Sequence, residues 1–291
     1  MTKEARKARR DRVDEFLGVP YLDRKFAFVV DDEVVDAARS LDTDLALVDD
    51  ARCKKALAEV SGLSATSPVP RDWLEAREIS KKAKEGKTVA LSLLAQEDAL
   101  LLDFPLGHPV HKVLYVGHPA DPRRYIPMGD FHRSLFEHKV AEAMRLLVGL
   151  GATEVQINHV SGWTSTSEVG LSGGGVVQGI LGAVDAKAGK TKGHSEQVVT
   201  KMSLRPRGEP RLPADLVWYA HEPLWKAIAE ARLSASLESF ELDITYRDDF
   251  QVNAKLRAKI ADIGLEVGGS FAEHKETVWN LRGKFGDPVI A

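Results

Sequence analysis

A cluster of glycines between two strand-like stretches restricts this sequence more than any other feature. Residues 169–193 hold 8 of the chain's 23 glycines in 25 positions. Glycine at that density carries too large a backbone entropy cost for an ordinary helix or strand. The flanking stretches, EVQINHVSGW and EQVVTKMSL, both have strand character. The sequence therefore predicts two strands separated by a glycine-rich insertion that is mobile or adopts a special conformation.

The insertion changes character along its length. Its first part, GVVQGILGAV, is apolar, whereas the following DAKAGKTKG is basic, and residues 186–211 carry a net charge of +5. Small apolar residues followed by lysines suit an anionic membrane surface. The residues expected to contact a membrane or a partner are Val176, Val177, Ile180, Leu181, Lys187, Lys190 and Lys192.

Two other interpretations of the insertion stay open. The first is a plain surface loop or short hairpin. The second is a phosphate or nucleic-acid contact made by Lys187, Lys190, Lys192, Lys201, Arg205 and Arg207. Nucleic acid is disfavoured because this basic run contains no aromatic residue for base stacking and does not amount to a domain-scale basic patch.

Composition places the chain among soluble globular proteins. Its 291 residues are 44% hydrophobic and 29% charged, with a net charge of −3. The single cysteine, Cys53, excludes an intrachain disulfide and a multi-cysteine zinc site, and it fits a reducing compartment. No stretch resembles a secretory signal or approaches the roughly 20 apolar residues that span a bilayer. The expected location is the cytoplasm.

Hydrophobic periodicity predicts an α+β fold with a mixed sheet. A strand, a helix and a second strand are expected over about residues 112–160. Further on, residues 240–246 alternate between apolar and polar side chains, which is typical of a strand with one wet face. Apolar runs at residues 26–30 and 45–48 each end in two aspartates, expected to be solvated carboxylates at strand ends. The charged residues 3–17 predict an exposed helix that is not part of a core.

Two prolines in SATSPVPRD indicate a boundary near residues 64–71. The predicted organisation is a charged helix with a small α/β region over residues 1–66. A main α+β domain over residues 67–291 contains the insertion at residues 169–193.

Six of the nine histidines fall between residues 108 and 159. Geometry argues against one shared metal ion, because His111 and His118 on one strand would lie about 23 Å apart at about 3.3 Å per residue. We therefore predict neither a metal site nor a cofactor. A metal held by His118, Asp130 and His132 is the alternative.

One group of residues has the arrangement of an anion site. His118 ends a predicted strand, and the loop after it leads to a helix that begins near Asp130. A helix N-terminus offers N–H groups and partial positive charge to an anion. The candidate ligand-binding residues are Arg123, Arg124 and Arg133. The candidate catalytic residues are His118, His132 and Asp130. The competing interpretation is an ordinary loop with solvated arginines.

No catalytic signature in the chain has the required spacing. The sequence therefore favours a binding or effector protein, acting through the insertion, over an enzyme. One alternative is an enzyme for a small phosphorylated or carboxylated substrate at the loop between His118 and Arg133. Another is a scaffold that self-assembles as a homo-oligomer through a strand edge such as residues 240–246. The expected partners are a small anionic ligand or an anionic membrane surface.

Overall fold

The computed structural model divides the chain into two compact units. It describes residues 3–40, 52, 55–56, 58–59, 69, 71–85, 90–163, 197–205 and 209–286. Unit 1 comprises Met1–Phe131 and Gln251–Glu273, and unit 2 comprises His132–Phe250 and His274–Ala291. Both contain helices and strands, which confirms the predicted α+β class.

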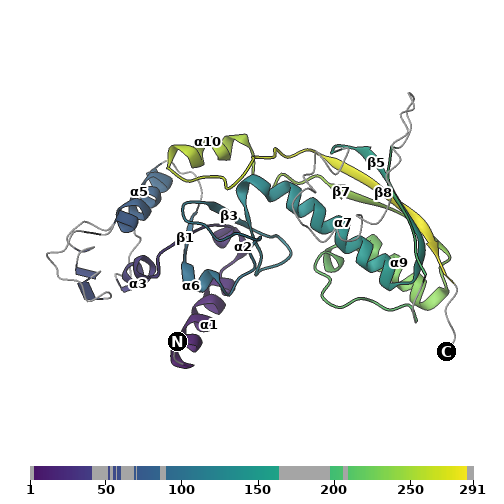
Figure 1. Cartoon of the computed structure of the whole chain (residues 1–291), viewed down its shortest axis with the longest axis horizontal. Helices are drawn as coiled ribbons and strands as arrows, with labels where there is room; N and C mark the ends of the chain where they lie inside the picture. Colours follow the sequence, from purple (N-terminus) through teal and green to yellow (C-terminus); the bar gives the residue numbers. More distant parts are fainter. Residues whose placement is uncertain are drawn as a thin grey trace. The chain divides into compact units, whose positions relative to one another are not determined.

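Unit 1 contains a four-stranded mixed sheet with the strand order β2-β1-β3-β4 (Figure 1). Strand β1 (Phe26–Val30) pairs in parallel with β2 (Ser92–Ala95) and antiparallel with β3 (Leu114–Gly117), which in turn pairs antiparallel with β4 (Tyr125–Pro127). The helices of this unit are α1 (Lys3–Gly18), α2 (Tyr21–Arg24), α3 (Asp32–Ser40), α5 (Arg71–Glu85), α6 (Gln96–Ala99) and α10 (Ala254–Asp262), with the 3-10 turn η2 (Met128–Asp130) before α7. The boundary predicted near residues 64–71 lies largely outside the described residues.

Helix α1 contributes to the core of unit 1, contrary to the prediction of a wholly exposed helix. Val13 is 2% exposed and packs with Val29 and Tyr115, while Phe16 and Leu17 cover the same cluster. The guanidinium of Arg12 donates two hydrogen bonds, of 2.7 and 2.5 Å, to the buried carboxyl group of Asp98. Helix α1 has few apolar residues, but they lie on one face. The prediction was based on the overall charge of the helix and therefore missed this apolar face.

Residues 251–273 complete unit 1 from far along the chain. Glu266 forms a backbone bridge with Val113, and the carbonyl oxygen of Val267 accepts a hydrogen bond from the Gly129 N–H. A side chain at position 268 would collide with Val113, since a Cβ atom there would lie 2.5 Å from its Cγ1. This close approach, with a φ of +68°, explains the glycine at this position.

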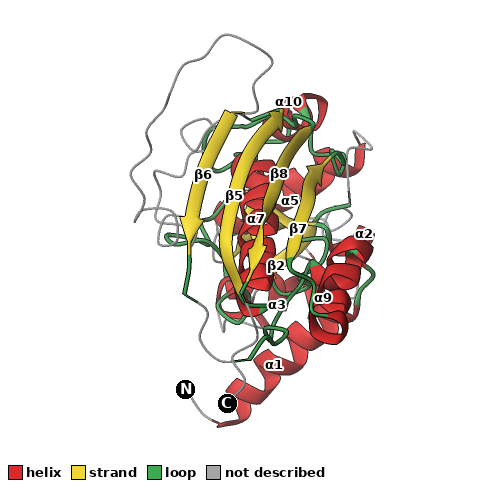
Figure 2. Cartoon of the chain, turned by 90° about the vertical axis from the view of Figure 1, so that its right-hand side faces the viewer, coloured by secondary structure: helices red, strands yellow, loops and turns green. Residues whose placement is uncertain are grey.

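Unit 2 is an antiparallel sheet with a long helix against one face. The strand order is β6-β5-β8-β7, formed by β5 (Ala152–Ser161), β6 (Gln197–Ser203), β7 (Ser239–Tyr246) and β8 (Thr277–Phe285) (Figure 2). Helix α7 (Phe131–Gly149) packs on the sheet through Phe136, whose ring lies 5.0 Å from that of Trp279. The unit also contains η3 (Tyr219–His221) and α9 (Pro223–Ala235).

The predicted alternation of residues 240–246 is confirmed in β7. Phe240, Leu242, Ile244 and Tyr246 are all buried, whereas Glu241 and Asp243 are exposed. Strand β7 also lies at an edge of the sheet. Self-assembly through this edge stays a prediction.

The predicted strand, helix and strand over residues 112–160 exist, but they do not form one βαβ unit. Strand β3 belongs to the sheet of unit 1, whereas β5 belongs to the sheet of unit 2. Strand β3 is antiparallel to both of its neighbours. Hydrophobic periodicity identifies individual elements but not their pairing partners, so it does not show that the two strands belong to different sheets.

In unit 2, the last residues of β5 and β7 and the first residues of β6 and β8 lie at the same end of the sheet. Ser161, at the end of β5, pairs with Val278, and Tyr246, at the end of β7, pairs with Thr277. Within the described ranges, no helix has the length and apolar character of a membrane span.

Candidate functional site

His118 stabilises the loop that joins β3 to β4. Its side chain is 1% exposed, and its Nδ1 accepts hydrogen bonds from the backbone N–H groups of Ala120 (3.1 Å) and Asp121 (3.0 Å). Because Nδ1 acts as an acceptor there, these contacts describe an imidazole that lacks a proton on this nitrogen. The sequence predicts that this loop leads directly to a helix, whereas it joins β3 to the antiparallel strand β4.

The arginines of this loop contact the protein itself. Arg123 Nη2 donates to the carbonyl oxygen of Leu101 at 2.5 Å. Arg124 Nε lies 3.5 Å from Asp121 Oδ2, and its side chain is 36% exposed. The loop is fixed further by two backbone hydrogen bonds of 2.9 Å, one from the Asp103 N–H to the carbonyl oxygen of Arg123 and one from the Tyr125 N–H to the carbonyl oxygen of Asp103. Anion binding by Arg123, Arg124 and Arg133 stays a prediction.

The predicted site is divided between the two units. His118, Arg123, Arg124 and Asp130 belong to unit 1, whereas His132 and Arg133 belong to unit 2. Asp130 is the last residue of η2, and its carboxyl group faces the turn at Gly269, where a Cβ atom would lie 3.2 Å from Asp130 Oδ2.

His132 lies in an aromatic cluster of unit 2. It is fully buried on α7, and its Nδ1 lies 2.7 Å from the hydroxyl oxygen of Tyr246 on β7. The ring of His274 lies 5.3 Å away, and its buried Nε2 has no hydrogen-bond partner among the described residues. The described residues contain no group of three or more His, Cys, Asp or Glu arranged to hold a metal ion.

The same cluster holds the chain just before the insertion. Trp163 donates its backbone N–H to Thr277 Oγ1 (3.3 Å), and its carbonyl oxygen accepts a hydrogen bond from Trp279 Nε1 (2.9 Å). Its ring stacks on Tyr246 at 6.0 Å. Gly162, with a φ of +88°, fits so closely that a Cβ atom there would lie 2.3 Å from Thr277 Oγ1. The chain is therefore held firmly up to Trp163.

The predicted contact residues of the insertion fall outside the described residues. These are Val176, Val177, Ile180, Leu181, Lys187, Lys190 and Lys192. The described chain resumes with β6, which pairs with β5 from His159 to Glu154. The structure thus describes the two strands that carry the insertion.

The acidic end of β1 has perturbed carboxyl groups. A hydrogen bond with Asp72 and, second, burial raise the pKa of Asp31 above its ordinary value, whereas His111 acts in the opposite direction. Burial, followed by the charge of Asp98, raises the pKa of Asp32. Nearby, hydrogen bonds from Lys112 and Arg71 lower the pKa of Glu75. Asp31 and Asp32, which the sequence presents as solvated, are therefore partly desolvated, whereas the aspartates after residues 45–48 lie outside the described residues.

The raised pKa of Asp31 and the lowered pKa of Glu75 predict that the two carboxyl groups affect the stability of unit 1 in opposite ways as pH changes. A raised carboxyl pKa stabilises the fold below the unfolded-state pKa, and this stabilisation is lost as pH rises through the folded-state value. Asp31→Asn should therefore stabilise unit 1 at pH 7 but not at pH 3. Glu75→Gln should destabilise it at pH 7, with the loss vanishing at low pH. Both changes should stay below about 1 kcal/mol because the groups are partly exposed. Urea unfolding at the two pH values measures them, and effects of equal sign would contradict the assignment.

Sequence reasoning missed the aromatic cluster. His132 and Tyr246 are 114 residues apart, and Trp163 and Trp279 are 116 apart. The sequence shows that histidines are concentrated between residues 108 and 159, and we therefore grouped His132 with residues close to it in sequence. Its hydrogen-bond partner, Tyr246, lies on β7.

Comparisons of the chain with protein-family models, curated proteins and solved structures find no match. Its function is therefore inferred from its own residues and geometry.

Proposed function

We propose that the protein is a cytoplasmic effector that contacts an anionic membrane surface through residues 169–193. The proposal rests on one observation: β5 and β6 are paired neighbours in the sheet, but an unusually long stretch of chain separates them in sequence. Antiparallel strands are usually joined by two to five residues. Here, 33 residues, 164–196, separate Trp163 from the start of β6. Connections longer than about 12 to 15 residues are uncommon, and they are usually either functional segments or linkers.

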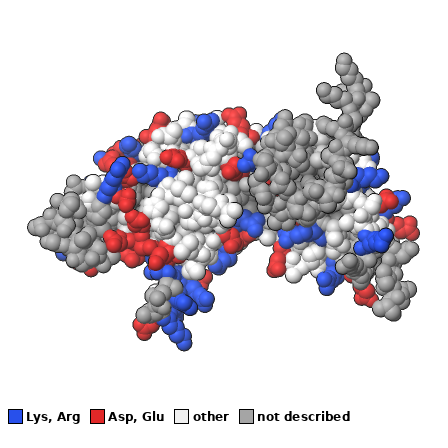
Figure 3. Space-filling model, viewed as in Figure 1, with Lys and Arg blue, Asp and Glu red and all other residues white. Residues whose placement is uncertain are grey.

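The sequence of the connection supports a membrane contact. Val176, Val177, Ile180 and Leu181 supply apolar side chains, and Lys187, Lys190 and Lys192 follow them. Apolar burial and attraction to anionic lipids add to each other in surface-binding segments. By contrast, acidic and basic side chains of the described residues are mixed over the face drawn in Figure 3. The insertion is therefore the better candidate for an electrostatic contact.

Vesicle binding tests the proposal. The full chain should bind vesicles of phosphatidylglycerol, with little binding to phosphatidylcholine, and deletion of residues 170–190 should abolish this binding. Each lysine near an anionic surface contributes about 1 kcal/mol, so replacing Lys187, Lys190 and Lys192 with glutamine should weaken binding about a hundredfold. Replacing Val176, Val177, Ile180 and Leu181 with serine should also weaken vesicle binding, because it removes the apolar part of the contact.

A matched control distinguishes a specific role of the insertion lysines in vesicle binding from an effect of the protein's net charge. Lys81, Lys82 and Lys84 are exposed on α5, and their replacement with glutamine changes the net charge by the same amount. This control should leave vesicle binding unchanged. Equal binding by the deletion variant and the full chain would exclude the membrane function.

A further inference from the structure

A segment of unit 2 crosses α7 and is fixed at two points. We call residues 209–219 the strap. Near its start, the Arg211 N–H donates to the carbonyl oxygen of Gly149 at 2.9 Å. Near its end, the N–H groups of Val217 and Tyr219 donate to the two carboxyl oxygens of Glu142, each at 2.8 Å. Glu142 is fully buried, so the strap cannot slide along the helix without breaking these hydrogen bonds.

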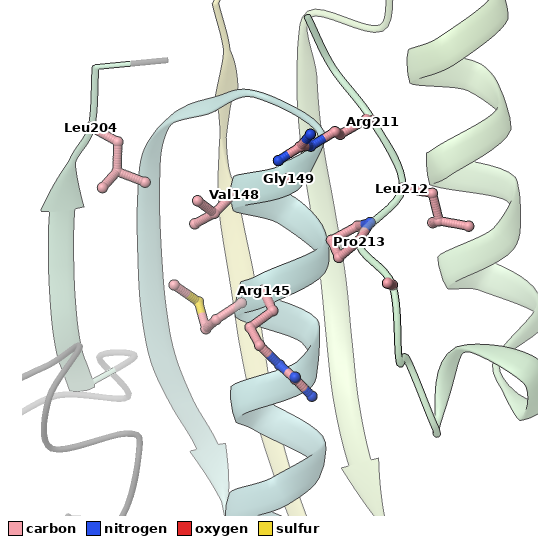
Figure 4. A pocket seen from close by; sticks show the side chains of 9 residues that line it. Arg145, Val148, Gly149, Leu204, Arg211, Leu212 and Pro213 are labelled. Carbon is pink, nitrogen blue, oxygen red and sulfur yellow. The ribbon is translucent and has the colours of Figure 1, made fainter. Parts of the chain in front are cut away.

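A cavity of about 740 Å³ lies beside the strap, between α7 and the end of β6. Its volume falls within the range of small-molecule sites. Figure 4 shows Val148 on α7 and Leu204 after β6 pointing toward each other. The lining residues are Met144, Arg145, Val148, Gly149, Leu204, Arg211, Leu212, Pro213 and Ala214.

The apolar lining is incompletely covered by the protein. Val148 is 47% exposed and Leu212 is 42% exposed, although both line a concave surface. Covering such side chains with an apolar ligand is favourable by roughly 25 cal/mol for each Å² removed from water. Apart from its arginines, the lining has few hydrogen-bonding groups. A sugar or a nucleobase would lose its hydrogen bonds to water on binding and would not regain them from the protein, so such a ligand is disfavoured.

Two arginines give the cavity its charge. Arg145 Nη2 lies 3.7 Å from Glu142 Oε2, which is too long for a hydrogen bond. Those oxygens already accept the two strap N–H groups, so Glu142 holds Arg145 only loosely. Arg211 is anchored through its backbone, and its exposed guanidinium belongs to the cavity lining. A planar guanidinium is well suited to binding a carboxylate.

We propose that this cavity binds a small amphiphilic carboxylate, with an aliphatic chain against Val148, Leu204 and Leu212 and its carboxylate on the guanidinium group of Arg211, while Arg145 adds positive charge to the lining. The site lies near the start of β5 and the end of β6, opposite the end that carries residues 164–196. It therefore goes beyond the proposed membrane contact and does not depend on it.

Calorimetric titration of the full chain with decanoate tests the proposal. One decanoate should bind per chain, whereas acetate, which lacks the tail, should not bind detectably. Decanol, which lacks the charge, should bind at least tenfold more weakly. Arg145→Gln and Arg211→Gln should each weaken decanoate binding about tenfold for the same reason. Val148→Trp should weaken decanoate binding at least tenfold, because the indole ring would occupy the space beside Leu204 that the aliphatic chain needs.

Matched variants control for charge and bulk elsewhere in unit 2. Arg247 is exposed and paired with Glu276, and Val160 is 52% exposed on β5. Arg247→Gln and Val160→Trp should leave decanoate binding unchanged, as should deletion of residues 170–190. Equal affinity for decanol and decanoate, undiminished binding by Val148→Trp, or uptake only in the presence of phosphatidylglycerol vesicles would each overturn the proposal.

Discussion

Gly283→Ala is expected to unfold the sheet of unit 2 at a much lower urea concentration than the unchanged chain requires. Gly283 lies in β8, between β5 and β7, where it pairs with Val155 and Phe240. A Cβ atom at this position would lie 1.8 Å from the carbonyl oxygen of Glu154. Because this obstacle is backbone rather than a flexible side chain, the strands must separate. We expect a loss of about 3 to 5 kcal/mol.

Tryptophan fluorescence is a suitable measurement, because Trp163, Trp218, Trp225 and Trp279 belong to unit 2 and only Trp73 belongs to unit 1. Lys284→Ala is the control, since Lys284 is exposed and follows Gly283 on the same strand. Its effect should stay within about 0.5 kcal/mol. Unfolding of Gly283→Ala at the same urea concentration as the unchanged chain would show that β8 does not approach Glu154 so closely.

The sequence predicted those elements whose burial has a simple period. The run Phe26–Val30 is apolar throughout and forms a strand buried along its whole length. Residues 240–246 alternate, and β7 presents one face to the core and one to water. In both cases, the environment of each residue is determined by its own strand, so local pattern was sufficient.

The sequence did not predict arrangements that depend on distant partners. Residues 251–273 return to unit 1 through backbone hydrogen bonds at Glu266 and Val267, and backbone groups carry no sequence signal. His118 was predicted as a candidate acid or base from its position after a strand, yet its Nδ1 accepts two loop N–H groups. A histidine that organises a turn and one that binds a ligand have the same sequence signature.

Glu142 shows how a single buried side chain links stability to the inferred binding site. Its two carboxyl oxygens accept hydrogen bonds from the backbone N–H groups of Val217 and Tyr219, and its side chain is fully buried. Glu142→Ala removes both acceptors. Because each of the two unpaired N–H groups costs about 1 to 3 kcal/mol, we expect the free energy of unfolding to fall by about 2 to 6 kcal/mol. Glu142→Gln keeps one oxygen acceptor and should lose about half as much.

Hydrogen exchange followed by mass spectrometry distinguishes release of the strap from general unfolding. In Glu142→Ala, amide protection should fall over residues 215–221 while that of β5 and β8 persists in the absence of urea, because the sheet hydrogen bonds do not involve Glu142. Decanoate affinity should fall in parallel, since Leu212 and Pro213 would no longer be held over α7. Glu230 is exposed on α9, so Glu230→Ala should change neither protection nor affinity. Full protection of residues 215–221 in Glu142→Ala would mean that the strap is fixed by other contacts, and the cavity beside it would then be independent of this carboxyl group.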